Sequence, residues 1–185
     1  MRVVAGSRRS LPLKTLPGTD TRPTLDRYKE TLFNIIQPYV QDSRFLDLFS
    51  GSGNIAIEAL SRGAKHAVLV ENSRAAVQVI KDNIHFTKFE NEADIVQRDA
   101  VTYVRNLTKV DFDIIYIDPP YSQGLEKAVL LELGRKDFSD PDNSIIIVEA
   151  ILEEDFSYIE EETPFEIYKV KNYKTNKHVF LRMKK

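Results

Sequence analysis

The stretch RFLDLFSGSGNIAIEALSRGAKHAVLVEN, residues 44–72, decides the fold class. It begins with an apolar run at 44–49 and continues through a turn rich in glycine and serine into an amphipathic segment at 54–63. A second apolar run follows at 66–71. This order predicts a strand, a helix and a second, parallel strand, with Gly63 where the helix should stop.

The same alternation continues along the chain. The later segments with a helical pattern are 73–86, 100–107 and 123–133, and the later apolar runs are 93–97, 113–118 and 144–150. Two alternating runs, 165–174 and 177–184, flank a polar turn at Thr175 and Asn176 and predict a terminal antiparallel hairpin. We therefore expect an α/β fold of about seven strands, in a mostly parallel sheet covered by helices on both faces.

The N-terminal part has a different character. The segment 24–40 predicts a helix that is capped by Thr24 and ended by Pro38. Before it lies a short extended arm whose first 19 residues carry four basic side chains and no acidic one. We accordingly divide the chain into a basic extension, 1–22, and one domain, 23–185.

Composition excludes several classes of function. The chain has 185 residues, a formal net charge of −2 and no cysteine, so it can form neither a disulfide framework nor a thiolate site. No apolar run approaches the ~20 residues of a membrane span, and we expect a cytoplasmic protein without a membrane. The histidines His66, His85 and His178 are far apart in sequence, so each is expected at the surface rather than at a metal.

The glycine turn and the acid after the second strand indicate a nucleoside cofactor. Gly51 and Gly53 let the backbone approach a ligand, and Glu71 lies 20 residues after Gly51, the spacing at which an acid reaches ribose hydroxyls. Asp47 would repel a pyrophosphate but attract the ammonium of a methionine moiety. Two alternatives stay open: the glycines serve turn geometry alone, or GSGNIA is the dinucleotide fingerprint of an NAD-type oxidoreductase.

The third strand is followed by QRDA, residues 97–100. Asp99 beside the small Ala100 is placed to meet an adenine amino group. Asp99 is equally suited to cap the helix that begins there. Both roles are compatible with the sequence.

The stretch IIYIDPPY, residues 114–121, predicts a site for an amine. Asp118 would lie at the carboxyl edge of the sheet, where ligands of open α/β folds bind. Pro119 and Pro120 remove two donors, so the local polar surface only accepts hydrogen bonds and suits an exocyclic NH2 group. Tyr121 offers a flat face for an extruded base. The alternative is a turn that merely ends a strand.

These motifs resemble those of class I S-adenosylmethionine-dependent methyltransferases, with DLFSGSG as the cofactor loop and DPPY as the amino-methyltransferase motif. More narrowly, TRPTLDRYKETLFN followed by LDLFSGSGNIAIEALSRGA resembles the RsmD family, which methylates the exocyclic N2 of a guanine in 16S ribosomal RNA. The resemblance implies a Rossmann-like fold with the last of seven strands antiparallel, S-adenosylmethionine as cofactor, S-adenosylhomocysteine as product and no metal. The partner would be 16S rRNA within a small ribosomal subunit or an assembly intermediate, bound by a monomer.

The resemblance also assigns residues. The cofactor-binding residues would be Asp47, Phe49, Gly51, Ser52, Gly53, Glu71, Asn72, Asp99 and Ala100, and the target amine and base would meet Asp118, Pro119, Pro120 and Tyr121. Candidates for phosphate contacts are Arg8, Arg9, Arg22 and Arg27. The resemblance implies that the extension 1–22 contacts RNA. Arg22 and Arg27 could instead pair with Asp26, Glu30 or the sheet edge and hold the arm on the body.

Three rival functions are weighed against this one. DNA adenine N6 methyltransferases also use DPPY, but little chain remains here for a module that reads duplex sequence. A dinucleotide oxidoreductase is the rival from another class. A catalytically inactive RNA-binding domain with the same fold is the third.

Overall fold

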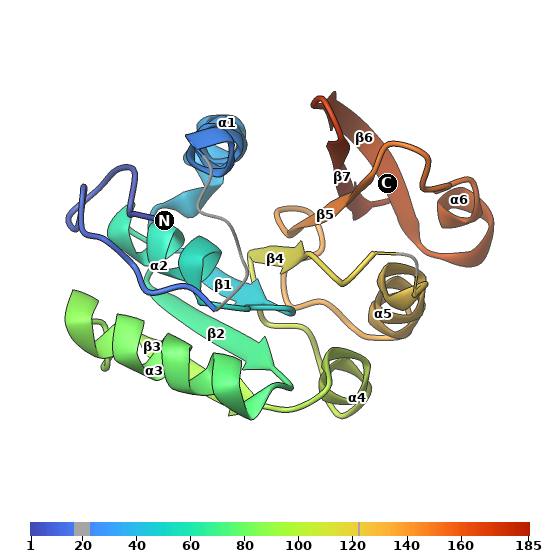
Figure 1. Cartoon of the computed structure of the whole chain (residues 1–185). Helices are drawn as coiled ribbons and strands as arrows, with labels where there is room; N and C mark the ends of the chain where they lie inside the picture. Colours follow the sequence, from blue (N-terminus) through green and yellow to red (C-terminus); the bar gives the residue numbers. More distant parts are fainter. Residues whose placement is uncertain (17–22, 122) are drawn as a thin grey trace.

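The computed structural model describes residues 1–16, 23–121 and 123–185. Within them, a seven-stranded sheet is flanked by helices (Figure 1). The strands are β1 (Arg44–Asp47), β2 (His66–Glu71), β3 (Ala93–Gln97), β4 (Ile114–Ile117), β5 (Ile145–Ile151), β6 (Phe165–Asn172) and β7 (Asn176–Met183). The helices are α1 (Pro23–Val40), α2 (Asn54–Ser61), α3 (Arg74–Thr87), α4 (Ala100–Arg105), α5 (Leu125–Leu133) and α6 (Tyr158–Glu162).

The strand order is β3-β2-β1-β4-β5-β7-β6, and β7 alone runs in the direction opposite to the other six strands. The predicted α/β fold with an antiparallel last strand is confirmed. After β3 the chain crosses back to pair β4 with β1, so the strand order reverses between these two strands. Ligands of open α/β sheets bind at such a switch point, outside the carboxyl ends of the strands.

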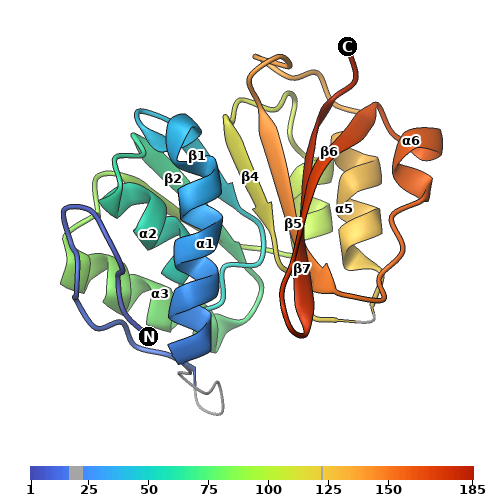
Figure 2. The same ribbon diagram turned by 90° about the horizontal axis from the view of Figure 1, so that it is seen from above.

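Both faces of the sheet are buried. On β1, Phe45 packs into a core cluster with residues of α1, α2 and α3, whereas the next residue, Leu46, packs into a second cluster with residues of α4, α5 and α6. Figure 2 shows the first three helices grouped over β1 and β2, while α5 and α6 accompany β4 to β7. The continuous apolar runs of β2 and β4 follow from this double coverage.

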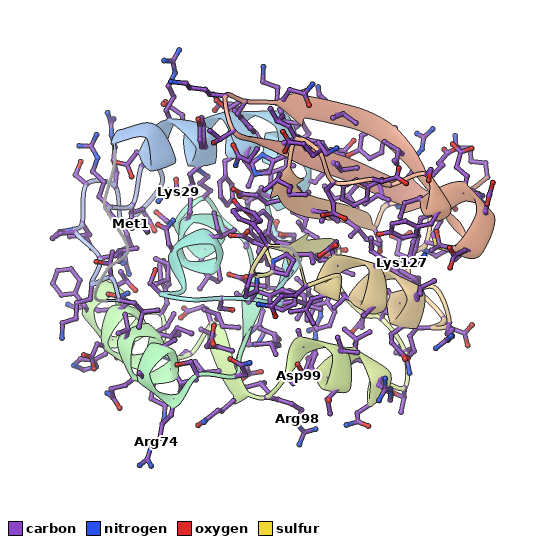
Figure 3. The ribbon with its side chains drawn as sticks, turned by 45° about the vertical axis from the view of Figure 1, so that its right-hand side comes forward. Met1, Lys29, Arg74, Arg98, Asp99 and Lys127 are labelled. Carbon is purple, nitrogen blue, oxygen red and sulfur yellow. The ribbon has the colours of Figure 1, made fainter. Side chains whose placement is uncertain are left out.

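The N-terminal arm is fixed to the body by a buried carboxylate. Glu58 on α2 is fully buried and accepts hydrogen bonds from the backbone N–H groups of Val4 (2.7 Å) and Ala5 (3.0 Å). It also pairs with Arg62 at 2.8 Å and with the buried Lys29 of α1 at 3.1 Å. Lys29 and Met1 line the same cavity, and Figure 3 labels both beside α1 and α2. The arm, α1 and α2 therefore share one ion-pair network.

Several local expectations are corrected. Helix α1 continues through Pro38 to Val40, because the proline removes only one hydrogen bond near the helix end and Val40 is fully buried in the core. The helix begins at Pro23, so Thr24 lies inside it rather than before it; the Thr24 side chain and Arg22 are outside the described part of the chain. Asn176 belongs to β7 rather than to the turn.

Two further points concern the tail and the surface. His178 is 1% exposed and not a surface residue, because β7 lies between β5 and β6 inside the sheet. The short helix α6 was not expected from the sequence pattern. None of the helices formed by the described residues is long and apolar enough to cross a membrane.

We expect Glu58→Gln to lower the free energy of unfolding by about 3 kcal/mol, because it leaves the buried Lys29 and Arg62 without their anion. Urea denaturation measures this loss. Glu30→Gln is the matched control, since Glu30 is exposed on α1, and should change stability by less than about 0.5 kcal/mol. Equal unfolding free energies for the two variants would contradict the role given to Glu58 in the ion-pair network.

Candidate active site

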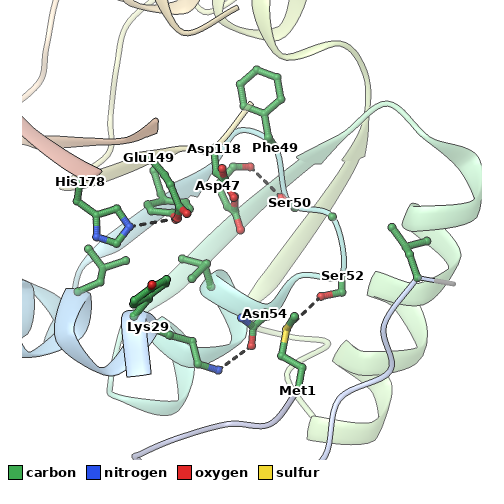
Figure 4. A pocket seen from close by; sticks show the side chains of 16 residues that line it. Met1, Lys29, Asp47, Phe49, Ser50, Ser52, Asn54, Asp118, Glu149 and His178 are labelled. Carbon is green, nitrogen blue, oxygen red and sulfur yellow. Dashed lines mark hydrogen bonds and ion pairs between the residues drawn. The ribbon is translucent and has the colours of Figure 1, made fainter. Parts of the chain in front are cut away.

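Two cavities open at the carboxyl ends of β1, β4 and β5. The first, of about 290 Å³, is lined by residues of the glycine turn, by Lys29 and by polar side chains of β4, β5 and β7 (Figure 4). The second, of about 460 Å³, is lined by the ends of β2 and β4 and the start of α4. Phe49, Gly51 and Asp118 line both cavities, so the two meet at the switch point.

The two glycines of the turn serve different purposes. Gly53 caps α2 with a φ of 77°, a conformation that favours glycine, and a Cβ there would also lie only 3.0 Å from Leu69 Cδ2. Gly51 has a φ of 54°, but a Cβ there would meet nothing within 4 Å. The backbone at Gly51 thus faces open space that both cavities share, which is where a ligand can approach it.

The acids of the second cavity are held by backbone groups. Glu71 accepts hydrogen bonds from the N–H groups of Gly51 (2.9 Å) and Ser73 (2.8 Å), so it ties the glycine turn to β2. Asp99 accepts from Thr102 N–H at 2.8 Å and is the N-cap of α4. The capping role is therefore confirmed, although Asp99 lines the second cavity as well. Asn72 and Ala100 complete this wall.

Asp47 is a buried carboxylate without a partner. It is 1% exposed, and neither of its carboxylate oxygens has a hydrogen-bond partner among the described residues. Burial raises the pKa of Asp47 to about 7 and the Glu71 charge adds to the shift; the amides of Ala56 and Phe49 moderate it without reaching hydrogen-bonding geometry. A buried carboxylate that faces a cavity and has no partner among the described residues suits a cationic group of a ligand.

The DPPY motif lies where the two cavities meet. Asp118 follows β4 directly, and burial raises its pKa well above the usual range, with the charges of Glu149 and Asp47 adding to the shift. Pro119 is buried, while Tyr121 is 51% exposed and lies on the wall of the second cavity. The motif therefore supplies the acid that lines both cavities.

Sequence reasoning missed a polar cluster on the far wall of the first cavity. Glu149 of β5 accepts hydrogen bonds from Tyr116 Oη (2.6 Å) and Asn176 Nδ2 (2.5 Å), and its Oε2 lies 3.1 Å from His178 Nε2. Ile117 pairs with Val148, so the next residues, Asp118 and Glu149, lie side by side. Glu149 is a carboxylate at the end of the apolar run IIIVEA, as Asp47 and Asp118 are at the ends of theirs. This pattern in the sequence could have predicted Glu149 as a site residue.

The predicted RNA-contacting arginines are not brought together. Arg8 donates from Nε to Thr87 O (2.7 Å) and stacks over Phe89, at the C-terminal end of α3 and the edge of the sheet opposite the cavities; Arg9 is exposed beside it. Arg27 lies instead on a third cavity, between α1 and the β6–β7 turn. Asp26 pairs with Arg2 at 3.0 Å, so it is Arg2 rather than Arg27 that ties the arm to α1 here.

No three histidine, cysteine, aspartate or glutamate side chains of the described residues gather where they could hold a metal ion.

A family model described as "Conserved hypothetical protein 95" matches residues 1–182. The chain belongs to this family, the RsmD family. This RsmD-family chain is 38% identical over 148 residues to the Bacillus subtilis protein named "Putative rRNA methyltransferase YlbH". The alignment covers 79% of this chain and 80% of the Bacillus protein. It is 34% identical over 151 residues to the "Ribosomal RNA small subunit methyltransferase D" of Haemophilus influenzae, and this alignment covers 80% of this chain and 78% of the Haemophilus protein.

A solved structure has the same architecture. The Escherichia coli protein described as "Putative methyltransferase yhhF" superposes with a TM-score of 0.83 at 29% identity, over 99% of this chain and 97% of that one. Together with the strand order, this similarity confirms the expected Rossmann-like methyltransferase fold.

We expect Asp47→Asn to stabilise the ligand-free protein, and by more at pH 8 than at pH 5. The pKa of Asp47 is about 7 in the folded chain and about 3.9 when unfolded, so the folded state binds the proton more tightly and stability falls as pH rises from 4 to 7. Each pKa unit corresponds to about 1.4 kcal/mol, which predicts a gain of a few kcal/mol at pH 8. Urea unfolding at both pH values measures it.

The exposed Asp142 provides the control, since Asp142→Asn should leave the pH dependence of unfolding as it is in the native chain. A gain for Asp47→Asn that is equal at pH 5 and pH 8 would show that the charge is not the cause.

Proposed function

We propose that this chain is an S-adenosylmethionine-dependent methyltransferase that modifies the exocyclic N2 amine of a guanine in 16S rRNA of the small ribosomal subunit. The observation that carries the proposal is the position of Asp118, an acid at the one place where both cavities meet. The names of the Bacillus and Haemophilus relatives, both rRNA methyltransferases, support the substrate class.

The residues of the two cavities fit the cofactor. Asp47, unpaired and buried beside Gly51 and Ser52, would accept the ammonium group of the methionine part. Glu71 and Asn72 would meet the ribose, and Asp99 and Ala100 the adenine, across the second cavity. When bound, the cofactor supplies a methyl group on a sulfonium sulfur. A pyrophosphate would face the unpaired Asp47, which disfavours a dinucleotide oxidoreductase.

Asp118 would bind the amine, and the two prolines beside it would present no backbone donor that competes for its oxygens. The Asp118 oxygen that carries no proton accepts a hydrogen bond from the NH2 group, which is possible whether or not the raised pKa leaves the other oxygen protonated. This bond holds the nitrogen lone pair toward the second reactant, which is a positioning effect. Once methylated, the amine nitrogen would be strongly acidic, and its proton would leave to Asp118 or water. Tyr121 offers its exposed ring to the target base.

A basic groove is our candidate for contact with the RNA backbone. The third cavity, about 550 Å³, is lined by the exposed cations Arg27, Lys171 and Lys174, and none of the described residues in its lining carries a carboxylate. Tyr28 lines both this groove and the first cavity, so phosphates bound here would lie next to the target base. Arg8, Arg9 and the arm 1–22, of which Arg22 lies outside the described residues, remain candidates for more distant contacts. We propose that a monomer acts in this way on small subunits in the cytoplasm.

We expect Asp118→Ala to bind S-adenosylhomocysteine normally but to methylate undermodified small subunits at least ~100-fold more slowly, because the amine loses its acceptor. Calorimetry and methyl transfer measure the two effects, and Asp142→Asn is the control for activity. Mass spectrometry of 16S rRNA from cells lacking the protein locates the modified guanine. Full activity of Asp118→Ala would refute the role of this acid, and an rRNA with unchanged modifications would refute the substrate.

We expect the double variant Lys171→Ala, Lys174→Ala to bind small-subunit RNA more weakly and with a flatter salt dependence. Each lost phosphate contact should reduce the slope of log K against log salt by about 0.7 to 0.9. The double variant Lys65→Ala, Lys109→Ala removes two exposed cations outside the groove and keeps the net charge matched. The same slope for both double variants would place the RNA elsewhere.

A further inference from the structure

Asp118 alone does not explain how one base would be chosen over another. Guanine and adenine both carry an exocyclic amine, and a single acceptor can hold either one. The ring nitrogen N1 beside the amine differs, because it carries a hydrogen in guanine and a lone pair in adenine. A second group next to Asp118 is therefore needed to distinguish the bases.

Glu149 is in the right place to be that group. The register of β4 with β5 sets it beside Asp118, and both side chains line the first cavity. Figure 4 shows Glu149, Asp118 and Asp47 grouped at one end of this cavity, with His178 next to Glu149. The Glu149 side chain is 16% exposed, so part of the carboxylate is accessible from the cavity.

The hydrogen bonds of Glu149 leave room for one more donor. A carboxylate offers about four lone-pair sites. Tyr116 Oη and His178 Nε2 both contact Oε2, whereas only Asn176 Nδ2 contacts Oε1. The second site on Oε1 has no donor among the described residues.

The same contacts keep Glu149 an acceptor. Burial opposes its ionisation, but hydrogen bonds from His178, Tyr116 and Asn176 hold the pKa of Glu149 below its ordinary value. His178 is oriented in turn by Tyr173, whose Oη lies 2.9 Å from His178 Nδ1, and the Tyr173 ring packs on Tyr28 at 4.5 Å. An ionised carboxylate can only accept hydrogen bonds. These contacts therefore fix the orientation of the Glu149 side chain and keep it an acceptor.

We infer that Glu149 selects guanine: its Oε1 accepts the N1–H of the target base while the unprotonated oxygen of the Asp118 carboxyl group accepts a hydrogen of the neighbouring N2 amine. Two adjacent acceptors match the two adjacent donors of guanine. Adenine would set the lone pair of its N1 against a carboxylate, and a buried mismatch of this kind is strongly rejected. The inference rests on the proposed function and adds the residue that reads the base.

The test uses 2-aminopurine, which keeps the exocyclic 2-amine but carries a lone pair at N1. Small subunits are assembled from 16S rRNA with either guanine or 2-aminopurine ligated at the position that mass spectrometry identifies. We expect the native protein to methylate guanine about 100-fold faster than 2-aminopurine. Comparable rates on the two bases would overturn the inference without any variant.

The variants assign the preference to its residue. Glu149→Gln presents an amide that can donate to N1, so the preference should shrink to less than about 10-fold, with S-adenosylhomocysteine binding retained. Tyr116→Phe disturbs the same cluster but leaves the carboxylate, and should keep the preference. The exposed Glu153→Gln, four residues along the chain, should change neither rate nor preference.

The outcomes are separable. A Glu149→Gln protein that binds S-adenosylhomocysteine and prefers guanine as strongly as the native chain overturns the role of Glu149 alone. Equal loss of preference in Tyr116→Phe also overturns it, since the effect would then come from the cluster as a whole. A native protein that methylates neither subunit overturns the proposed function, and the inference with it.

Discussion

The parallel pairing of β1 with β4 is the constraint on which the site depends. It aligns Asp47 with Tyr116, so the acid that follows β4, Asp118, emerges at the same edge as the glycine turn that follows β1. Parallel strands end on the same side, and a reversal of strand order leaves a gap between the loops that follow them. Both cavities occupy this gap, and Asp47, Glu71 and Asp118 lie on its walls.

The site is built at a cost in stability. Asp47 and Asp118 are enclosed by protein with raised pKa values, and Asp47 has no partner in the described structure. Burying such groups lowers the stability of the folded chain, but it leaves acceptors for the cationic group and the amine that we propose as ligands. Glu149 is different, because three donors already compensate its charge.

The N-terminal arm connects the site to the rest of the molecule. Glu58 holds the backbone of the arm and the charge of Lys29 in one network, and Lys29 in turn donates to Asn54 Oδ1 (2.6 Å) at the start of α2. Lys29 lines the first cavity, but its contacts with Arg2 O, Asn54 and Glu58 already use the three hydrogens of its ammonium group. It therefore supports the cavity wall and the glycine turn instead of offering a free charge.

The amino-acid sequence by itself determined the α/β class, the glycine turn, and the acids Asp47, Glu71 and Asp118, because the alternation of helix and strand patterns fixes which residues follow a parallel strand. The capping choice at Asp99 and the course of α1 past Pro38 needed the structure, since both depend on local geometry and burial. Only the tertiary structure placed His178 and Asn176 beside Glu149, 29 and 27 residues away. The insertion of β7 between β5 and β6 is a long-range pairing, and periodicity along the chain carries no information about which distant strand a segment will join.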